Sequence, residues 1–347
     1  MDKKLILAVA GSGKTTHILN DLKPENRSVI LTYTNQNLFS LEESLRRNNG
    51  GIIPAHVEVR TYFSFLYSFC LRPYLSYDLR DNGFVYGPVP AHAQKKKKSS
   101  LEHYMSSGRY LYAARAAKLL LESKVMPKVK ERLRRHFDCL YVDEVQDFAA
   151  NDFNFLLDIS QSGVKALYAG DYYQHTYDTS RDGSTRSTLH SKGLDAYVAE
   201  FKKAGFAVDD TTLSSSRRCS SSVCAYISDT LGIEIDSHRT DAVEVRYLSD
   251  PAEIVKVFSD AKIVKLFYQS YQKYNCFGNN WGNSKGLDSY TDVCVVLNKT
   301  SFDLLQQGKG RDLATATKNK LYVACSRARG NLYFVEEALL KRLIMSA

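Results

Sequence analysis

The chain has 347 residues, of which 44% are hydrophobic and 24% charged, values that suit a folded protein of about two domains and exclude a disordered chain. No apolar run approaches the roughly 18 residues of a membrane span, and seven cysteines without a CxxC pair argue against a zinc site or disulfide framework and for reduced thiols in the cytoplasm. The net charge of +9 favours polyanionic partners, although solubility alone also accounts for it.

Short apolar runs bounded by turn residues recur along the chain and predict strands. In chain order the first four are residues 5–9, 29–32, 139–142 and 166–169, and three later ones are residues 243–248, 293–297 and 332–335. Continuous runs of this length are typical of parallel strands buried on both faces. We therefore predict an α/β fold with two parallel sheets flanked by helices, divided into residues 1–211 and 212–347.

A change in amino-acid composition at residues 75–135 predicts a small insertion in the first domain. Tyrosines, prolines and four consecutive lysines (95–98) precede a stretch at 111–121 that is expected to be helical. The lysine run is expected to be an exposed loop, because solvated lysines are more common than lysines that contact phosphate. A second stretch, residues 178–194, is rich in Ser, Gly and Asp and predicts another loop.

The segment Ala-Gly-Ser-Gly-Lys-Thr follows the first expected strand and resembles the end of a Walker A loop, with Ala8 where the full pattern has glycine. Backbone N–H groups and a helix N-terminus would bind phosphates, Lys14 would reach the β and γ oxygens, and Thr15 would bind Mg²⁺. The alternative, a simple glycine turn, gives the lysine and the hydroxyl no purpose. The candidate nucleotide-binding residues here are Ala10, Gly11, Ser12, Gly13, Lys14, Thr15 and Thr16.

Carboxylates follow the third expected strand, as in a Walker B segment. Asp143 would bind Mg²⁺, and Glu144 would orient or deprotonate the attacking water. A solvated charge cluster is the alternative explanation. The next strand ends at Gly170-Asp171, and Gln174 soon after it would sense the γ-phosphate, unless this segment is only a turn with exposed aromatic residues.

Together these segments resemble motifs II and III of the UvrD/Rep/PcrA-like superfamily 1 DNA helicases. The other family motifs have counterparts in the expected order: motif Ia at residues 31–35, motif Ib at 61–64, an arginine-bearing segment at 213–218, motif V at 284–288 and motif VI at 321–328. Motif Ib has phenylalanine where the family usually has histidine, and motif V has aspartate for glutamate. The resemblance extends over residues 5–335.

The resemblance implies two RecA-like domains that hydrolyse ATP with Mg²⁺. It makes Arg218 the γ-phosphate arginine and Arg327 the second arginine finger, which would neutralise charge on the transferring phosphoryl group. Arg217 stands in place of the adenine-stacking tyrosine, and Gly286 and Asp288 belong to the nucleotide-binding motif V. The implied nucleic-acid contacts are Tyr33, Thr34, Asn35, Thr61 and Tyr177, although core packing explains any one aromatic residue equally well.

We therefore expect an ATP-dependent translocase or helicase on single-stranded DNA, with RNA as the alternative strand and 3′ to 5′ polarity by resemblance. The interval between Arg218 and Lys285 is too short for the large 2B accessory domain of full-size relatives. The lack of room for a 2B domain favours an alternative function, a nucleic-acid-responsive ATPase that acts with a protein partner such as a nuclease. A small-molecule kinase with the same loop would leave Arg218 and Arg327 unexplained.

Overall fold

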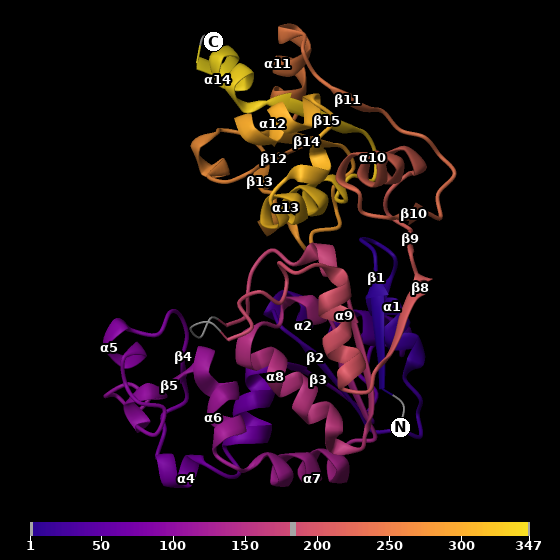
Figure 1. The fold of residues 1–347 in the computed structure, drawn as a ribbon. Coiled ribbons are helices and arrows are strands. Elements are labelled where there is room, and N and C mark those ends of the chain that lie inside the picture. The colour runs from indigo at the N-terminus through magenta and orange to yellow at the C-terminus, as the bar shows by residue number, and fades with distance from the viewer. Residues whose placement is uncertain (1–2, 181–184, 346–347) are drawn as a thin grey trace. The chain divides into compact units, whose positions relative to one another are not determined.

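The computed structural model describes residues 3–180 and 185–345 (Figure 1). They form two compact units. Unit 1 comprises the chain up to Ile6, Thr15–Gly170 and Tyr177–Asp209, and unit 2 comprises Leu7–Lys14, Asp171–Thr176 and the chain from Asp210 onward. The two short segments fall within the predicted first domain, but hydrogen bonds to α13 (Thr315–Cys325) make them part of unit 2.

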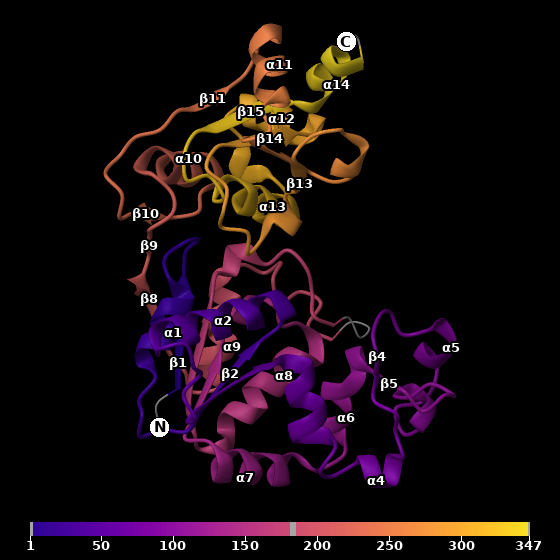
Figure 2. The same cartoon turned by 180° about the vertical axis from the view of Figure 1, so that it is seen from behind.

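Unit 1 is built around the six-stranded sheet β3-β2-β6-β7-β1-β8, in which the β3–β2, β2–β6 and β6–β7 pairings are parallel. Helix α9 lies in front of this sheet in Figure 1, and α1 and α2 lie in front of it in Figure 2. The strands are β1 (Lys3–Ala8), β2 (Ser28–Thr32), β3 (Val57–Thr61), β6 (Cys139–Val142), β7 (Lys165–Gly170) and β8 (Ala207–Leu213). The main helices are α1 (Lys14–Asp21), α2 (Asn35–Asn48), α8 (Ala150–Ile159) and α9 (Leu194–Lys203).

The expected insertion is a set of short elements with its own two-stranded parallel sheet, β4–β5. Its elements are α4 (Ser76–Leu79), β4 (Phe84–Val85), α5 (Ala91–Gln94), β5 (Leu111–Tyr112), α6 (Ala116–Glu122) and α7 (Met126–His136). The expected helix over 111–121 is therefore wrong in its first half. The backbone there pairs with β4, and the Leu111 N–H donates to the Gly83 carbonyl over 2.9 Å, so helix α6 begins only afterwards. The lysine run lies exposed in turns after α5.

Unit 2 is built around the all-parallel sheet β11-β15-β14-β12-β13. Alternate strand residues face opposite sides, so that Val293 and Val295 pack with α10 and α13, whereas Cys294 and Val296 pack with α11 and α14. Both faces are thus covered, and the predicted α/β class with two parallel sheets flanked by helices is confirmed. The elements are β9 (Ser215–Ser216), α10 (Ser221–Leu231), β10 (Asp236–Ser237), β11 (Val245–Tyr247), α11 (Pro251–Ser259), β12 (Val264–Phe267), β13 (Gly278–Asn280), β14 (Val293–Leu297), α12 (Lys299–Gln306), α13 (Thr315–Cys325), β15 (Leu332–Glu336) and α14 (Glu337–Met345).

Four strands of the two main sheets, β3, β8, β12 and β13, were not predicted, because polar residues or glycine interrupt or replace the apolar run in each of them. Strand β12 is instructive: it is fully buried although Lys265 lies in its middle. The Lys265 ammonium donates hydrogen bonds to the Asp260 and Ile263 carbonyls, at 2.5 and 2.9 Å, which makes its burial tolerable. The expected loop over 178–194 agrees with turns at the described residues 185–192, and its residues 181–184 lie outside the described part.

None of the described helices combines the length and the apolar character that crossing a bilayer requires. All seven cysteines are free thiols, and Cys276 alone among them is not fully buried.

Asp152 on α8 predicts a pH dependence of stability. Its carboxylate is fully buried, with the Tyr62 hydroxyl donating to it over 2.9 Å, and burial raises its pKa to about 6. A carboxyl group whose pKa is higher in the folded state binds more protons there, so the free energy of unfolding falls as pH rises from about 4 to about 6. At 1.36 kcal/mol per pKa unit the loss is about 3 kcal/mol.

Asp152→Asn should remove this slope, and denaturant titrations of wild type and variant between pH 4 and 7 measure the difference. Asp158→Asn is the matched control, because Asp158 lies on the same helix but is partly exposed beside Lys130. A wild-type curve parallel to that of Asp152→Asn would show that Asp152 has an ordinary pKa.

Candidate nucleotide and nucleic-acid site

The predicted phosphate-binding loop connects the end of β1 to the start of α1. Gly11 and Gly13 have φ of +70° and +97°, a region that only glycine adopts readily. The Ser12 N–H and hydroxyl both donate to the Val9 carbonyl, at 3.3 and 2.9 Å, which closes the turn. Lys14 and Thr15 are the first residues of α1, where the partial positive charge of a helix N-terminus favours an anion, and Thr16 is exposed.

Two predicted magnesium ligands meet within unit 1. The Thr15 hydroxyl donates to Asp143 Oδ2 over 3.4 Å, and Asp143 is 3% exposed at the end of β6. Neighbouring oxygen ligands of an octahedral Mg²⁺ lie about 3 Å apart, given metal–oxygen distances of about 2.1 Å. The hydroxyl and the carboxylate therefore fit this ion in both chemistry and spacing.

Glu144 follows Asp143 in a left-handed conformation, with φ of +56°. Its N–H donates to Asp143 Oδ1 over 2.9 Å, and its carboxylate accepts a hydrogen bond from the Gln146 side-chain amide. These two contacts hold the backbone of Glu144 in this sparsely populated conformation, which costs energy in a residue other than glycine. Gly170 is needed beside this turn, because a Cβ there would lie 2.9 Å from Val145 Cγ1 and would collide with Gln146.

In unit 2 the phosphate-binding loop is tied to α13 by the fully buried Tyr322. The Ala10 N–H donates to the Tyr322 hydroxyl over 2.8 Å, and this hydroxyl donates to Asp171 Oδ2 over 2.9 Å. Gln174, the predicted γ-phosphate sensor, donates to the same Asp171 oxygen over 2.9 Å. The sequence did not single out Tyr322, although its place within the motif VI-like run could have drawn attention to it.

Further backbone bonds explain why the loop clusters with unit 2. The Val9 N–H donates to the Leu213 carbonyl over 3.0 Å, and the Arg217 N–H donates to the Gly11 carbonyl over 2.9 Å. A Cβ added at Gly11 would lie 2.6 Å from Arg218 Cβ. The loop and the arginine-bearing segment are thus in direct contact, as a shared phosphate site requires.

This contact predicts that Gly11→Ala weakens ATP binding at least about tenfold, because either the loop or Arg218 must shift. The left-handed φ adds a conformational cost of about 1–2 kcal/mol. Gly50→Ala separates the two effects, since Gly50 has a similar φ of +64° but nothing within 4 Å of an added Cβ. Denaturant unfolding should show a loss of stability in both variants, and titration with a fluorescent ATP analogue should show a loss of affinity for Gly11→Ala only. Equal ATP affinity in the two variants would contradict the prediction.

The two predicted arginine fingers converge on one carboxylate. Arg218 and Arg327 both contact Asp288 Oδ1, at 2.5 and 3.3 Å. Arg327 is 1% exposed and also donates through Nε to the Val323 carbonyl over 3.2 Å, whereas the Asp288 side chain is 55% exposed. Of the other predicted nucleotide-binding residues, Arg217 and Gly286 are both exposed, and Gly286 has φ of +79°.

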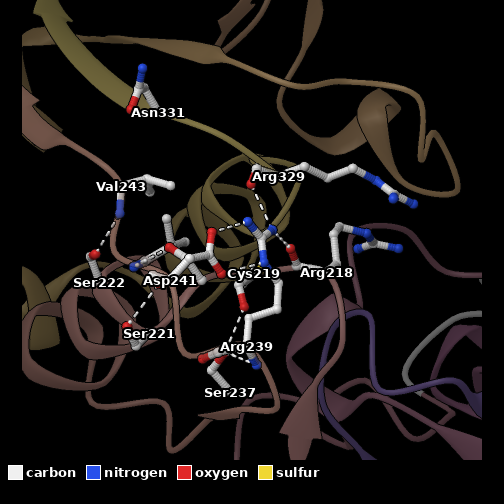
Figure 3. Close-up of polar contacts among 12 residues, drawn as sticks. Arg218, Cys219, Ser221, Ser222, Ser237, Arg239, Asp241, Val243, Arg329 and Asn331 are labelled. Carbon is white, nitrogen blue, oxygen red and sulfur yellow. Dashed lines mark hydrogen bonds and ion pairs between the residues drawn. The ribbon is translucent and has the colours of Figure 1, made fainter.

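Arg239, which the sequence did not predict to be part of the site, binds the main chain at Arg218 and at Arg329, two residues after Arg327 (Figure 3). Its Nη1 donates to the carbonyls of Arg218 and Arg329, at 2.5 and 2.6 Å. The Asp241 carboxylate accepts from the other edge of the guanidinium, with Nε to Oδ1 at 2.8 Å. Sequence alone offered no reason to choose Arg239, since it lies in a polar segment between strands.

The predicted nucleic-acid contacts lie in unit 1 and have mixed environments. The rings of Tyr33 and Tyr177 lie 5.8 Å apart between centroids. Thr34 and Thr61 cap helices: their hydroxyls accept from the N–H groups of Asn37 and Ser64, at 3.1 and 3.3 Å. These two hydroxyls therefore have a structural role already, while Asn35 is exposed at the start of α2.

No family model and no curated protein matches the chain. Among solved structures it is similar to a crystal structure of the arterivirus nonstructural protein 10 helicase, at 13% sequence identity, and to a structure of that helicase in complex with DNA, at 14%, with a TM-score of 0.49 in both cases. The alignments cover 98% of this chain but only 61% and 63% of the helicase chains, so this chain spans about three fifths of their length. At these values the similarity identifies no family.

Proposed function

We propose that the chain is a nucleic-acid-dependent ATPase of the superfamily 1, UvrD-like type that translocates on single-stranded DNA. The observation that carries the ATPase is the meeting of the Thr15 hydroxyl and the Asp143 carboxylate, 3.4 Å apart, directly before Glu144. A bound Mg²⁺ would neutralise phosphate charge at these oxygens. We assign the RecA-like domains to residues 1–211 and 212–347, the insertion to 75–135, and the setting to the cytoplasm.

In this proposal each polar group of the site has one task. Lys14 and the N-terminal N–H groups of α1 bind the β and γ phosphates, and Glu144 accepts a proton from the attacking water. Arg218 and Arg327 stabilise the negative charge that develops on the transferring phosphoryl group. Gln174 shares Asp171 with Tyr322, so a change at the γ-phosphate would pass through this buried carboxylate to α13.

A specific observation favours the second candidate, an ATPase that responds to nucleic acid and acts with a partner such as a nuclease. The chain between Arg218 and Lys285 forms α10, β11, α11, β12 and β13, which are elements of unit 2 itself. No described segment remains there to form an accessory domain that engages duplex. ATP hydrolysis is therefore better supported than unaided strand separation.

Two measurements test the proposal and separate its forms. The ATPase rate should rise when an oligo(dT) strand is added to the purified chain, and a matched oligo(U) strand compares DNA with RNA. Strand displacement on a duplex with a 3′ single-stranded tail, and with a 5′ tail as control, then tests unwinding and polarity. Stimulation without displacement would favour the partner-dependent ATPase, and an ATPase rate unchanged by either nucleic acid would refute the motor.

A further inference from the structure

Five aromatic rings gather in unit 1 where β2 and β3 end, and we call Tyr33, Phe63, Phe84, Tyr86 and Tyr177 the aromatic platform. Phe63 lies at its centre: its ring centroid is 5.7 Å from that of Tyr33, 5.5 Å from that of Tyr86 and 6.1 Å from that of Phe84. Tyr33 in turn contacts Tyr177 at 5.8 Å. The rings come from four separate segments, and Phe84 and Tyr86 belong to the insertion.

Some rings of the platform are exposed to solvent, and the platform packs on other rings that are fully buried. Tyr86 is 66% exposed and Tyr177 36%, while Tyr33 and Phe63 are partly buried. The rings rest on Tyr62 and Phe148, both fully buried and in edge-to-face contact at 4.8 Å. Burial fixes the rings of Tyr62 and Phe148, and their contacts orient the platform rings that pack on them. Binding a flat apolar partner to the platform therefore costs little conformational entropy.

The charge beneath the rings favours bases over phosphates. Burial, followed by the negative charges of Asp152 and Asp147, raises the pKa of Tyr33 to about 12, so its phenol stays neutral. Both carboxyl groups are fully buried and cannot move away from the platform. A phosphate placed over these rings would meet this negative charge, whereas a neutral base would not.

We propose that Phe63 and Tyr86 extend the contacts of Tyr33 and Tyr177 and stack on unpaired bases of a single-stranded nucleic acid. The inference rests on the proposed function and adds two binding residues, one of them carried by the insertion. Stacking on aromatic faces accepts any base, so the platform would grip the strand without reading its sequence. A duplex would not fit, because its bases are already stacked on each other.

Binding of a fluorescently labelled oligo(dT), measured by anisotropy without ATP, tests the platform. Phe63→Ala and Tyr86→Ala should each raise the dissociation constant about tenfold, within the roughly 5- to 150-fold range of a lost stacking contact. Tyr86→Phe keeps the ring and should bind like wild type. Tyr77→Ala is the matched control, because Tyr77 is 92% exposed in the same insertion but lies on α4, outside the platform.

An oligonucleotide of the same length with abasic sites distinguishes stacking from phosphate contacts. Wild type should bind it more weakly than oligo(dT), and Tyr86→Ala should show a smaller difference between the two ligands. The platform proposal is refuted if Tyr86→Ala and Tyr77→Ala bind oligo(dT) equally well. It is also refuted if removal of the bases weakens binding to wild type and to Tyr86→Ala by the same factor. Neither result would contradict the proposed ATPase motor. If wild type binds no single strand, the proposed function fails instead.

A different observation, the Arg239 contacts in unit 2, supports a second inference. One guanidinium nitrogen holds the carbonyls of Arg218 and Arg329, and Asp241 fixes the other edge of the group. Ser237 reinforces this arrangement, since its hydroxyl donates to the Cys219 carbonyl over 2.8 Å. The two main-chain segments that carry the predicted arginine fingers are thus joined through a single side chain.

We infer that Arg239 is a positioning residue that keeps Arg218 and Arg327 in register for ATP hydrolysis. It touches no predicted nucleotide-binding side chain and would act only through the two backbones. Because a misplacement of about 1 Å can cost about a hundredfold in rate, loss of the tether should lower kcat and leave ATP binding nearly unchanged. This inference also rests on the proposed ATPase.

Arg239→Ala should lower kcat about tenfold or more at an unchanged KM for ATP, and Arg239→Lys should restore little, since lysine lacks the planar fork. Arg246→Ala is the control: Arg246 pairs with Glu244 and Glu253 in the same unit but contacts neither arginine segment. In an Arg218→Ala background the further loss from Arg239→Ala should shrink. A loss of the same size in both backgrounds, or one confined to KM, would refute a role through Arg218.

Discussion

ATP turnover is expected to fall by about 10²- to 10⁴-fold in Glu144→Gln, while ATP binding persists. The range is that of a lost general base. The substitution keeps the shape of the side chain and one oxygen, so the hydrogen bond from the Gln146 amide can still form. Folding should therefore be preserved, and the loss should appear in kcat.

Lys14→Ala provides the complementary result, because it removes the cation expected at the phosphates. We expect it to abolish turnover together with most of the ATP affinity, as measured by titration with a fluorescent ATP analogue. Glu200→Gln is the matched control in unit 1: Glu200 is partly exposed and pairs with Arg186 and Lys203, and its replacement should leave both activities intact. Hydrolysis at the wild-type rate by Glu144→Gln would show that this carboxylate is not the base.

Removal of either predicted arginine finger is expected to cost about 10³-fold or more in DNA-stimulated kcat. Both guanidinium groups meet at Asp288 Oδ1, so each is held near the other before any phosphate arrives. Charge that develops on the transferring phosphoryl group would be opposed by both. We therefore expect Arg218→Ala and Arg327→Ala to be strongly non-additive when combined.

Arg327 requires a second variant, because the residue is fully buried and its truncation would remove the hydrogen bonds that it donates to the Val323 and Leu287 carbonyls. Arg327→Lys retains the charge and most of the volume, yet it cannot form two parallel hydrogen bonds to a phosphate. We expect it to fold, as judged by its melting temperature, and still to lose most of kcat. Turnover near wild type in Arg218→Ala and in Arg327→Lys would remove both residues from the catalytic set.

Much of the fold could be predicted from sequence because its central strands are short apolar runs. Residues 29–32, 139–142 and 293–297 lie within the observed bounds of β2, β6 and β14. The missed strands show the limit of this reasoning. β12 contains a lysine whose ammonium donates hydrogen bonds to carbonyls of the preceding turn, and the edge strands β3 and β8 are polar since each has a single neighbour in the sheet.

The candidate site likewise contains segments that the sequence predicts and residues that it does not. A phosphate-binding loop and magnesium-binding carboxylates after β6 could be predicted from sequence, because each is a contiguous segment whose residue types suit phosphate or Mg²⁺. Tyr322, Arg239 and Tyr86 could not, since each contributes through a partner far along the chain, such as the Ala10 N–H for Tyr322 or the Phe63 ring for Tyr86.

By itself, then, the sequence determined the alternation of buried strands and helices and the chemistry of the segments that follow them. Tertiary structure alone decided that Asp288 holds both arginines, that one tyrosine hydroxyl joins the phosphate-binding loop to Asp171, and that an inserted tyrosine completes a set of exposed rings. The physical reason is that apolar periodicity fixes which face of an element is buried. It carries no information about which atoms of distant elements come within hydrogen-bonding or stacking distance.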